Sequence, residues 1–204
     1  ELIYTQHMMS DMEGALASAE RFIRLHPLHK QVDYAYYMRG LSVYELGFNF
    51  VERYTPSEQA RRDPTPFRDA FNYFDELLRR YPDSQYNEDA QKRMIFLRDR
   101  LAQYEVGVGR FYLKRHAYLA AAQRGERVML GYQGTSAVAD ALALQIEAYR
   151  LLGQDLEAQQ ALALLNKNYP EHEQLTEEGK FIDSGLTKED RRTLIGVMSF
   201  GLIE

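Results

Sequence analysis

The residue types that carry enzyme chemistry are few and scattered in this 204-residue chain. It has five histidines and no cysteine, so a thiolate nucleophile, a cysteine metal site and a disulfide within the chain are excluded. No two histidines have the i, i+4 spacing of a helical metal site, and neither an HExxH motif nor a nucleophile elbow occurs. Gly107 and Gly109 lack the third glycine of a dinucleotide-binding loop. A general acid would need a carboxyl group that is shielded from solvent and so stays protonated near neutral pH. Glu177, Glu178 and Glu189 lie in a polar tail, which does not provide such shielding. The sequence therefore predicts no catalytic residue, no metal and no cofactor.

Tyrosine is the other chemically informative residue type, with fifteen copies and no tryptophan. Tyr34, Tyr37, Leu41 and Tyr44 fall on one stripe of a helix. A tyrosine combines a rigid ring with a hydroxyl, which suits it to hold an extended peptide. Filling the grooves between neighbouring helices is the more common use of such a stripe. Both interpretations stay open, and Tyr34, Tyr37 and Tyr44 form a candidate substrate groove.

A repeated spacing predicts the helices that position these residues. An alanine is followed twelve residues later by a proline or its replacement, with an aromatic residue just before it. The four copies run from Ala15 to Pro27, from Ala70 to Pro82, from Ala121 to Gln133 and from Ala158 to Pro170. The positions four and seven after each alanine are mostly apolar, and offsets of zero, four and seven share one helical face. Each copy is thus an amphipathic helix that ends at the proline, and the chain is a repeat protein.

Two copies extend upstream in matching register. Tyr112 and Tyr149 each lie nine residues before an anchor alanine, and Gly109 and Ile146 lie three residues before these tyrosines. This arrangement is typical of the tetratricopeptide repeat, a helix-turn-helix of about 34 residues. We therefore expect an all-α fold, a right-handed α-solenoid of tetratricopeptide repeats. The small residue at Gly109 should let paired helices approach closely.

Extra material separates the first three anchor alanines. The pattern predicts a helix over 32–46 that ends at Gly47, and then a proline-rich loop through Thr55 to Pro66. It predicts one long helix from Asn87 to about Arg115, because no proline occurs there and apolar residues alternate at spacings of three and four. In the last 34 residues, Thr187 to Asp190 resembles a capping box, followed by the apolar face of Leu194, Ile195 and Met198, which predicts a C-terminal helical cap.

Composition narrows the function classes further. The formal net charge of -5 argues against a nucleic-acid partner, since phosphate recognition needs a dominant basic face. No run approaches the roughly 18 apolar residues that span a bilayer. The chain begins at Glu1 with an apolar, helix-like stretch, from which we expect the native start to lie upstream. We expect residues 1–170 to form about four repeats, the first truncated, and residues 171–204 to form a C-terminal helical extension.

Five ordered segments carry a resemblance to a known family. They are Arg21 to Pro27, Asp33 to Leu41, Arg62 to Pro64, Tyr81 to Tyr86 and Phe96 to Tyr104. In this order they resemble the BamD family, the lipoprotein component of the machine that inserts β-barrel proteins into bacterial outer membranes. The resemblance covers about residues 1–170. Residues 47–61 and the tail from Glu171 differ from the family pattern.

The resemblance implies a non-catalytic scaffold on the periplasmic face of the outer membrane, attached through a lipidated cysteine. It implies that C-terminal repeats dock to the last POTRA domain of BamA, and that the N-terminal half meets BamC and unfolded outer-membrane proteins. Arg115 and Arg124 match basic positions of the family's BamA-facing repeat, a role that suits the bidentate guanidinium. A solvated helix face is the ordinary alternative for both arginines.

Two other functions stay open at this point. One is the helical superhelix domain of a peptidoglycan-cleaving enzyme, which would require a catalytic glutamate in a globular lobe that the repeats leave no room for. The other is a general peptide-binding repeat protein with a different partner.

Overall fold

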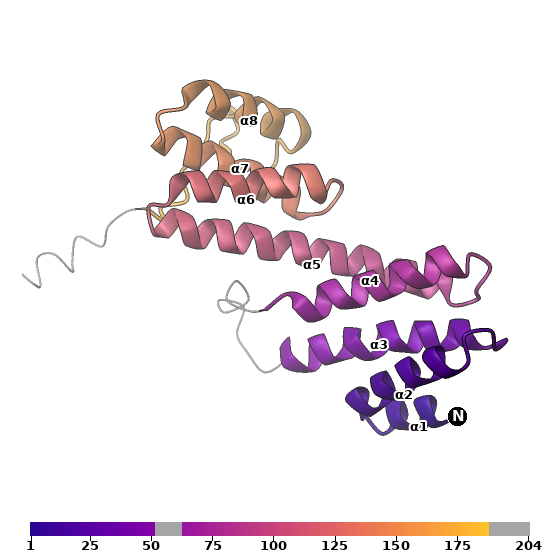
Figure 1. Cartoon of the computed structure of the whole chain (residues 1–204). Coiled ribbons are helices and arrows are strands. Elements are labelled where there is room, and N and C mark those ends of the chain that lie inside the picture. The colour runs from indigo at the N-terminus through magenta and orange to yellow at the C-terminus, as the bar shows by residue number, and fades with distance from the viewer. Residues whose placement is uncertain (52–62, 188–204) are drawn as a thin grey trace, which may run out of the picture. The chain divides into compact units, whose positions relative to one another are not determined.

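The computed structural model describes residues 1–51 and 63–187, and within these ranges the regular elements are α-helices. They are α1 (Leu2–Met8), α2 (Met12–Leu25), α3 (Val32–Val51), α4 (Thr65–Arg80), α5 (Asn87–Lys114), α6 (Tyr118–Gly131), α7 (Ala137–Leu151) and α8 (Asp155–Asn168) (Figure 1). The only β pairing in the described ranges is an isolated antiparallel bridge between Leu175 and Phe181. The predicted all-α fold class is confirmed.

The chain divides into two compact units, each with its own core. The N-terminal unit comprises Glu1–Val108 and Arg127–Val138, and the C-terminal unit comprises Gly109–Glu126 and Ala139–Glu204. Consecutive helices α1 to α4 pack against one another in the N-terminal unit (Figure 1). Its core gathers buried residues from Ile3 to Leu97. The C-terminal unit has a smaller cluster built from Leu113, Ala121, Ala122, Leu144 and Ala148.

All four predicted repeat helices form, as α2, α4, α6 and α8, and their anchor alanines are buried. Each helix ends at the residue before the aromatic, whose backbone N–H donates to the carbonyl four residues earlier. These bonds run from His26 to Phe22 (2.8 Å), Tyr81 to Leu77 (2.9 Å), Tyr132 to Val128 (2.9 Å) and Tyr169 to Leu165 (2.8 Å). Proline disfavours the helical conformation in the residue before it. In the copy that has Gln133 instead, the chain turns at Gly134, whose φ is 78°.

The predicted long helix is α5, with 28 residues from Asn87 to Lys114. Its start is tied to the preceding turn, because the Asn87 side-chain amide donates to the carbonyl oxygens of Tyr81 (2.8 Å) and Pro82 (2.9 Å). Glu88 and Asp89 lie in its first turn, where negative charge favours the helix dipole.

The predicted end of the third helix at Gly47 is wrong, because α3 continues to Val51. Gly47 lies inside the helix, where it makes room for a neighbour. A Cβ atom there would come within 2.8 Å of the Phe67 ring, so the glycine serves the close packing of α4 on α3. The next helix also begins earlier than predicted, since α4 starts at Thr65 and Pro66 lies in its first turn. Most of the predicted loop, residues 52–62, lies outside the described residues.

Residues 171–187, which we call the C-terminal strap, follow α8 and contain no helix. The strap folds back on itself through the bond from the Ile182 N–H to the Gln174 carbonyl (2.9 Å) and turns at Gly179, whose φ is 74°. The Asn166 side chain of α8 donates to the Gly179 carbonyl (3.0 Å). The predicted capping helix with Leu194, Ile195 and Met198 lies outside the described residues, and the division at residue 170 stays a prediction.

Candidate partner-binding sites

The turn that joins α5 and α6 positions Arg115. Three backbone bonds of 3.0 Å close this turn: Arg115 N–H and Ala117 N–H both donate to the Tyr112 carbonyl, and His116 N–H donates to the Leu113 carbonyl. His116 has a φ of 58°, a left-handed conformation that histidine tolerates better than most residues. Its Nδ1 lies 2.8 Å from the Tyr118 hydroxyl. The Arg115 side chain is therefore exposed at the end of a well-bonded turn.

Both predicted arginines lie over aromatic rings in the C-terminal unit. The Arg115 guanidinium carbon is 5.4 Å from the centre of the Phe111 ring, and that of Arg124 is 5.7 Å from the centre of the Tyr112 ring. The two ring centres are themselves 6.0 Å apart. The structure thus brings Arg115 and Arg124 onto adjoining rings. We call Phe111, Tyr112, Arg115 and Arg124 the basic-aromatic patch.

Gly109 allows α6 to approach α5 closely enough to form this patch. A Cβ atom at Gly109 would lie 2.2 Å from the Leu144 side chain and 3.2 Å from the Cβ atom of Arg124. The predicted role of this small residue in close packing is confirmed.

Phe111 was not identified from the repeat spacing. The signal that could have found it is its i, i+4 relation to Arg115, which places the two side chains together on a helix.

The three predicted groove tyrosines are half-buried in the N-terminal unit and pack against its core. Tyr37 stacks on Tyr86 with ring centres 4.9 Å apart and planes 18° apart, and Tyr34 lies 5.6 Å from the same ring. Farther along α3, Tyr44 lies 6.5 Å from Phe74 and 6.3 Å from Phe96. The tyrosines therefore fill the grooves between α3 and the helices packed against it.

A polar cluster binds the Tyr37 hydroxyl at the edge of this row. Tyr37 donates to Asp89 Oδ2 (2.7 Å), and Arg93 Nε donates to the same oxygen (2.6 Å). The Arg93 guanidinium also lies 4.8 Å from the centre of the Tyr44 ring. Burial, reinforced by the bond to Asp89, raises the pKa of Tyr37 to about 12. Burial alone would raise the pKa of Asp89, but the hydrogen bonds from Arg93 and Tyr37 outweigh it and hold that pKa below its ordinary value.

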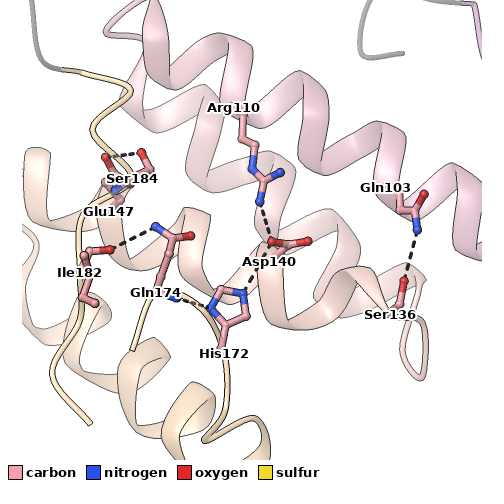
Figure 2. A network of polar contacts seen from close by, with 9 residues as sticks. All are labelled: Gln103, Arg110, Ser136, Asp140, Glu147, His172, Gln174, Ile182 and Ser184. Atoms are coloured by element: carbon pink, nitrogen blue, oxygen red, sulfur yellow. Dashed lines mark hydrogen bonds and ion pairs between the residues drawn. The ribbon is translucent and has the colours of Figure 1, made fainter. Parts of the chain in front are cut away.

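Polar contacts attach the C-terminal strap to α7, and one of the α7 residues involved also pairs with α5 (Figure 2). Arg110 donates to Asp140 Oδ1 (2.5 Å), and His172 Nε2 of the strap lies 3.6 Å from the same oxygen. The other ring nitrogen of His172 accepts a bond from the Gln174 N–H (3.2 Å), so Nε2 carries the proton that points to Asp140. Repeat spacing did not identify these strap residues, because none belongs to a helix.

Two further features bear on the class of site. Among residues 1–51 and 63–187, no group of three histidine, aspartate or glutamate side chains is placed to hold a metal ion. In the same part of the chain, no helix combines the length and apolar character that crossing a membrane requires.

Comparison with known proteins gives one family and several named relatives. The model of a family described as outer membrane lipoprotein, YfiO, matches residues 1–175. A Vibrio cholerae protein named outer membrane protein assembly factor BamD is 42% identical over 153 residues, which are 75% of this chain and 64% of that protein. A Neisseria meningitidis serogroup A protein of the same name is 39% identical over 173 residues, or 85% of this chain and 65% of that protein.

A third relative with this name, from Xylella fastidiosa strain 9a5c, is 38% identical over 172 residues, which are 84% of this chain and 59% of that protein. The chain therefore spans less than two thirds of the length of these relatives.

Proposed function

The chain belongs to the YfiO family of outer membrane lipoproteins, and from that membership we propose that it is a non-catalytic adaptor of the machinery that assembles outer membrane proteins. The observation that carries this proposal is the match over residues 1–175, supported by relatives named as outer membrane protein assembly factors. The repeated helical architecture supports it too, since stacked helical hairpins typically offer extended surfaces to other proteins. A lipid anchor would hold the protein on the periplasmic face of the outer membrane.

The basic-aromatic patch is the proposed docking site for the last POTRA domain of BamA. Arginine and aromatic residues are enriched where interfaces gain most of their affinity. Ring contacts restrain both guanidinium groups before a partner arrives, so binding orders fewer side-chain rotamers. A guanidinium can then bind a carboxylate or a backbone carbonyl of the partner through two parallel hydrogen bonds.

The row of Tyr34, Tyr37 and Tyr44 is the proposed contact for unfolded outer-membrane proteins, and the N-terminal half is the proposed side for BamC. Partial exposure of the three rings supports contact with an aromatic side chain of a substrate peptide. The Tyr37 hydroxyl is already bonded to Asp89, so Tyr37 would offer its ring edge and not its hydroxyl.

Charge reversal tests the BamA contact most directly. Arg124→Glu should weaken binding to the purified POTRA domain by about tenfold or more, because it removes a fork of donors and adds a repulsive charge. Arg124→Lys keeps the positive charge but not the paired donors of the guanidinium, and should lose less affinity for the POTRA domain. Arg21→Glu, at an exposed position of α2 in the N-terminal unit, is the matched control.

Unchanged recovery of BamA with both Arg115→Glu and Arg124→Glu would remove the patch from the interface. A cell-wall digestion assay on the purified chain tests the non-catalytic part of the proposal, and release of peptidoglycan fragments would contradict it.

A further inference from the structure

The C-terminal strap ends in a tight turn that is locked to α7. The Ser184 N–H donates to Glu147 Oε2 (3.0 Å) and the Ser184 hydroxyl donates to Glu147 Oε1 (2.9 Å) (Figure 2). The same hydroxyl accepts a bond from the Leu186 N–H (3.2 Å). Between them, Gly185 has a φ of 74°, a left-handed conformation that favours glycine. Ser184 therefore both holds the strap on α7 and sets the direction of Leu186.

Glu147 makes this lock strong because it is buried. Only 3% of the residue is exposed, and a buried carboxylate is stable only when hydrogen-bond donors satisfy it. Ser184 supplies one donor to each of its two oxygens, and hydrogen bonds to a charged acceptor are stronger than neutral ones. Loss of the Ser184 hydroxyl would leave one oxygen without this donor.

The turn places Leu186 against the core of the C-terminal unit. Leu186 packs on the cluster formed by Leu113, Ala121, Ala122, Leu144 and Ala148, and Tyr112 and Tyr118 pack against the same cluster. Leu113 and Tyr112 precede the α5–α6 turn, whereas Tyr118 and Ala121 follow it. The strap thus contacts a core to which both sides of the Arg115-bearing turn are attached.

A second attachment joins the strap to α7, which in turn pairs with the helix that carries Phe111 and Tyr112. His172 faces Asp140 of α7, and Asp140 pairs with Arg110 of α5. Arg110 directly precedes Phe111 and Tyr112, the rings on which the two patch arginines lie.

We propose that the strap is a positioning element for the basic-aromatic patch, with Ser184 and Glu147 as its positioning residues. By holding Leu186 on the core cluster, they keep the α5–α6 turn in the conformation that presents Arg115 and Arg124 to a protein partner. This inference rests on the proposed function. The family match covers residues 1–175, so the lock at 184–186 lies outside the matched residues.

Hydrogen exchange and binding, measured on the whole chain, test this proposal together. In Ser184→Ala, the amides of Arg115, His116 and Ala117 should exchange on the order of tenfold faster, since the turn loses the support of a charge-assisted bond. Affinity for the purified POTRA domain should fall severalfold. Ser184→Thr keeps the hydroxyl and should stay close to wild type in both measurements. The Tyr81 amide at the end of α4, in the N-terminal unit, should not change in either variant.

Leu186→Ala provides a second variant that leaves Glu147 and Ser184 intact. It should also accelerate exchange in the α5–α6 turn. Unchanged exchange in both Ser184→Ala and Leu186→Ala would overturn the inference. If Arg124→Glu weakens binding as expected, the inference would also be overturned by variants whose turn exchanges faster but whose affinity for the POTRA domain is unchanged. If Arg124→Glu itself binds normally, the proposed BamA contact fails instead, and the exchange data alone then decide whether the strap orders the turn.

Discussion

One repeat helix of each unit differs sharply in the size of the residue at the same position of the repeat. Four residues after the anchor alanine, the N-terminal unit has Phe74 on α4 and the C-terminal unit has Gly125 on α6, and both are buried. On the helix that faces each of these residues, the sizes are reversed. Gly40 of α3 faces the Phe74 ring, where a Cβ atom would lie 2.7 Å away, whereas Gln145 of α7 faces Gly125, where a Cβ atom would lie 2.5 Å from the Gln145 Cγ.

In these two helix pairs the larger side chain and the glycine exchange places, and both pairs stay in close contact. A large residue on one helix meets a small one on its neighbour, as close packing at nearly constant density requires. In the N-terminal unit the rings of Tyr34, Tyr37 and Tyr44 pack against the core, and in the C-terminal unit the Arg124 guanidinium carbon lies 5.7 Å from the centre of the Tyr112 ring.

The largest expected effect comes from removing the buried ring of Phe74 in the N-terminal unit. Phe74→Ala removes a fully buried ring and leaves a cavity beside Gly40, so it should lower the free energy of unfolding by about 3–5 kcal/mol. Urea denaturation followed by circular dichroism measures this change. Leu25→Ala, at a position that is 56% exposed, is the control and should have little effect. A loss below about 1 kcal/mol for Phe74→Ala would contradict close packing at this position.

The second prediction enlarges the small residue Gly125 in the C-terminal unit. Gly125→Ala places a methyl group 2.5 Å from the Gln145 side chain and 2.8 Å from the Ala141 carbonyl oxygen, which is backbone and cannot move aside. Strain should outweigh the better helix propensity of alanine and lower stability by about 1–3 kcal/mol. Urea denaturation again provides the measurement, and a stabilised variant would show that the helices are not in close contact at this position.

The third prediction concerns the hydrogen bond between the Tyr37 hydroxyl and Asp89. Tyr37→Phe removes the bond to Asp89 and should cost about 1 kcal/mol, since the hydroxyl is only half-buried. Because the folded pKa of about 12 lies above the ordinary value of 10.0, the neutral hydroxyl favours the folded state. This contribution is complete below about pH 10 and is lost as the pH rises through about 12.

Tyrosinate absorbance and stability measured across that alkaline range check the Tyr37 prediction. The wild type should retain one late-ionising tyrosine that the Phe variant lacks. Identical alkaline titrations of the two proteins would contradict the assignment.

The smallest expected effect sharpens the role of Gly125. Gly131→Ala lies on the same helix, but none of the residues that the structure describes comes within 4 Å of a Cβ atom at that position. Stability should change by no more than about 0.5 kcal/mol, because only helix propensity at the last residue of α6 is altered. A large loss would mean that glycine is required in α6 for a reason other than helix contact.

Periodicity predicted the helices well wherever alternation and proline agreed. The ends of α2, α4 and α8 follow from proline, which acts on its immediate neighbour regardless of tertiary contacts. Gly47 shows where local reasoning failed. A glycine after an apolar helix signals a C-terminus, yet here the Phe67 ring, twenty residues away in sequence, decides that the glycine lies inside α3.

The candidate sites divide in the same way. Arg115, Arg124 and the three tyrosines could be selected from residue type, spacing and family resemblance. Phe111 was missed, although its i, i+4 relation to Arg115 is a helical spacing. The strap lock between Ser184 and Glu147 could not be selected, since these residues are 37 positions apart in sequence and follow no helical period.

By itself, the sequence determined the all-α class, the positions of the four anchor helices and the long α5, because these depend on hydrophobic period and on the backbone limits of proline. Only the tertiary structure decided which small residues terminate helices and which admit a neighbour, which rings carry Arg115 and Arg124, and how residues 171–187 are held. Those features arise from contacts between segments distant in sequence, and a local pattern does not encode the identity of the partner atom.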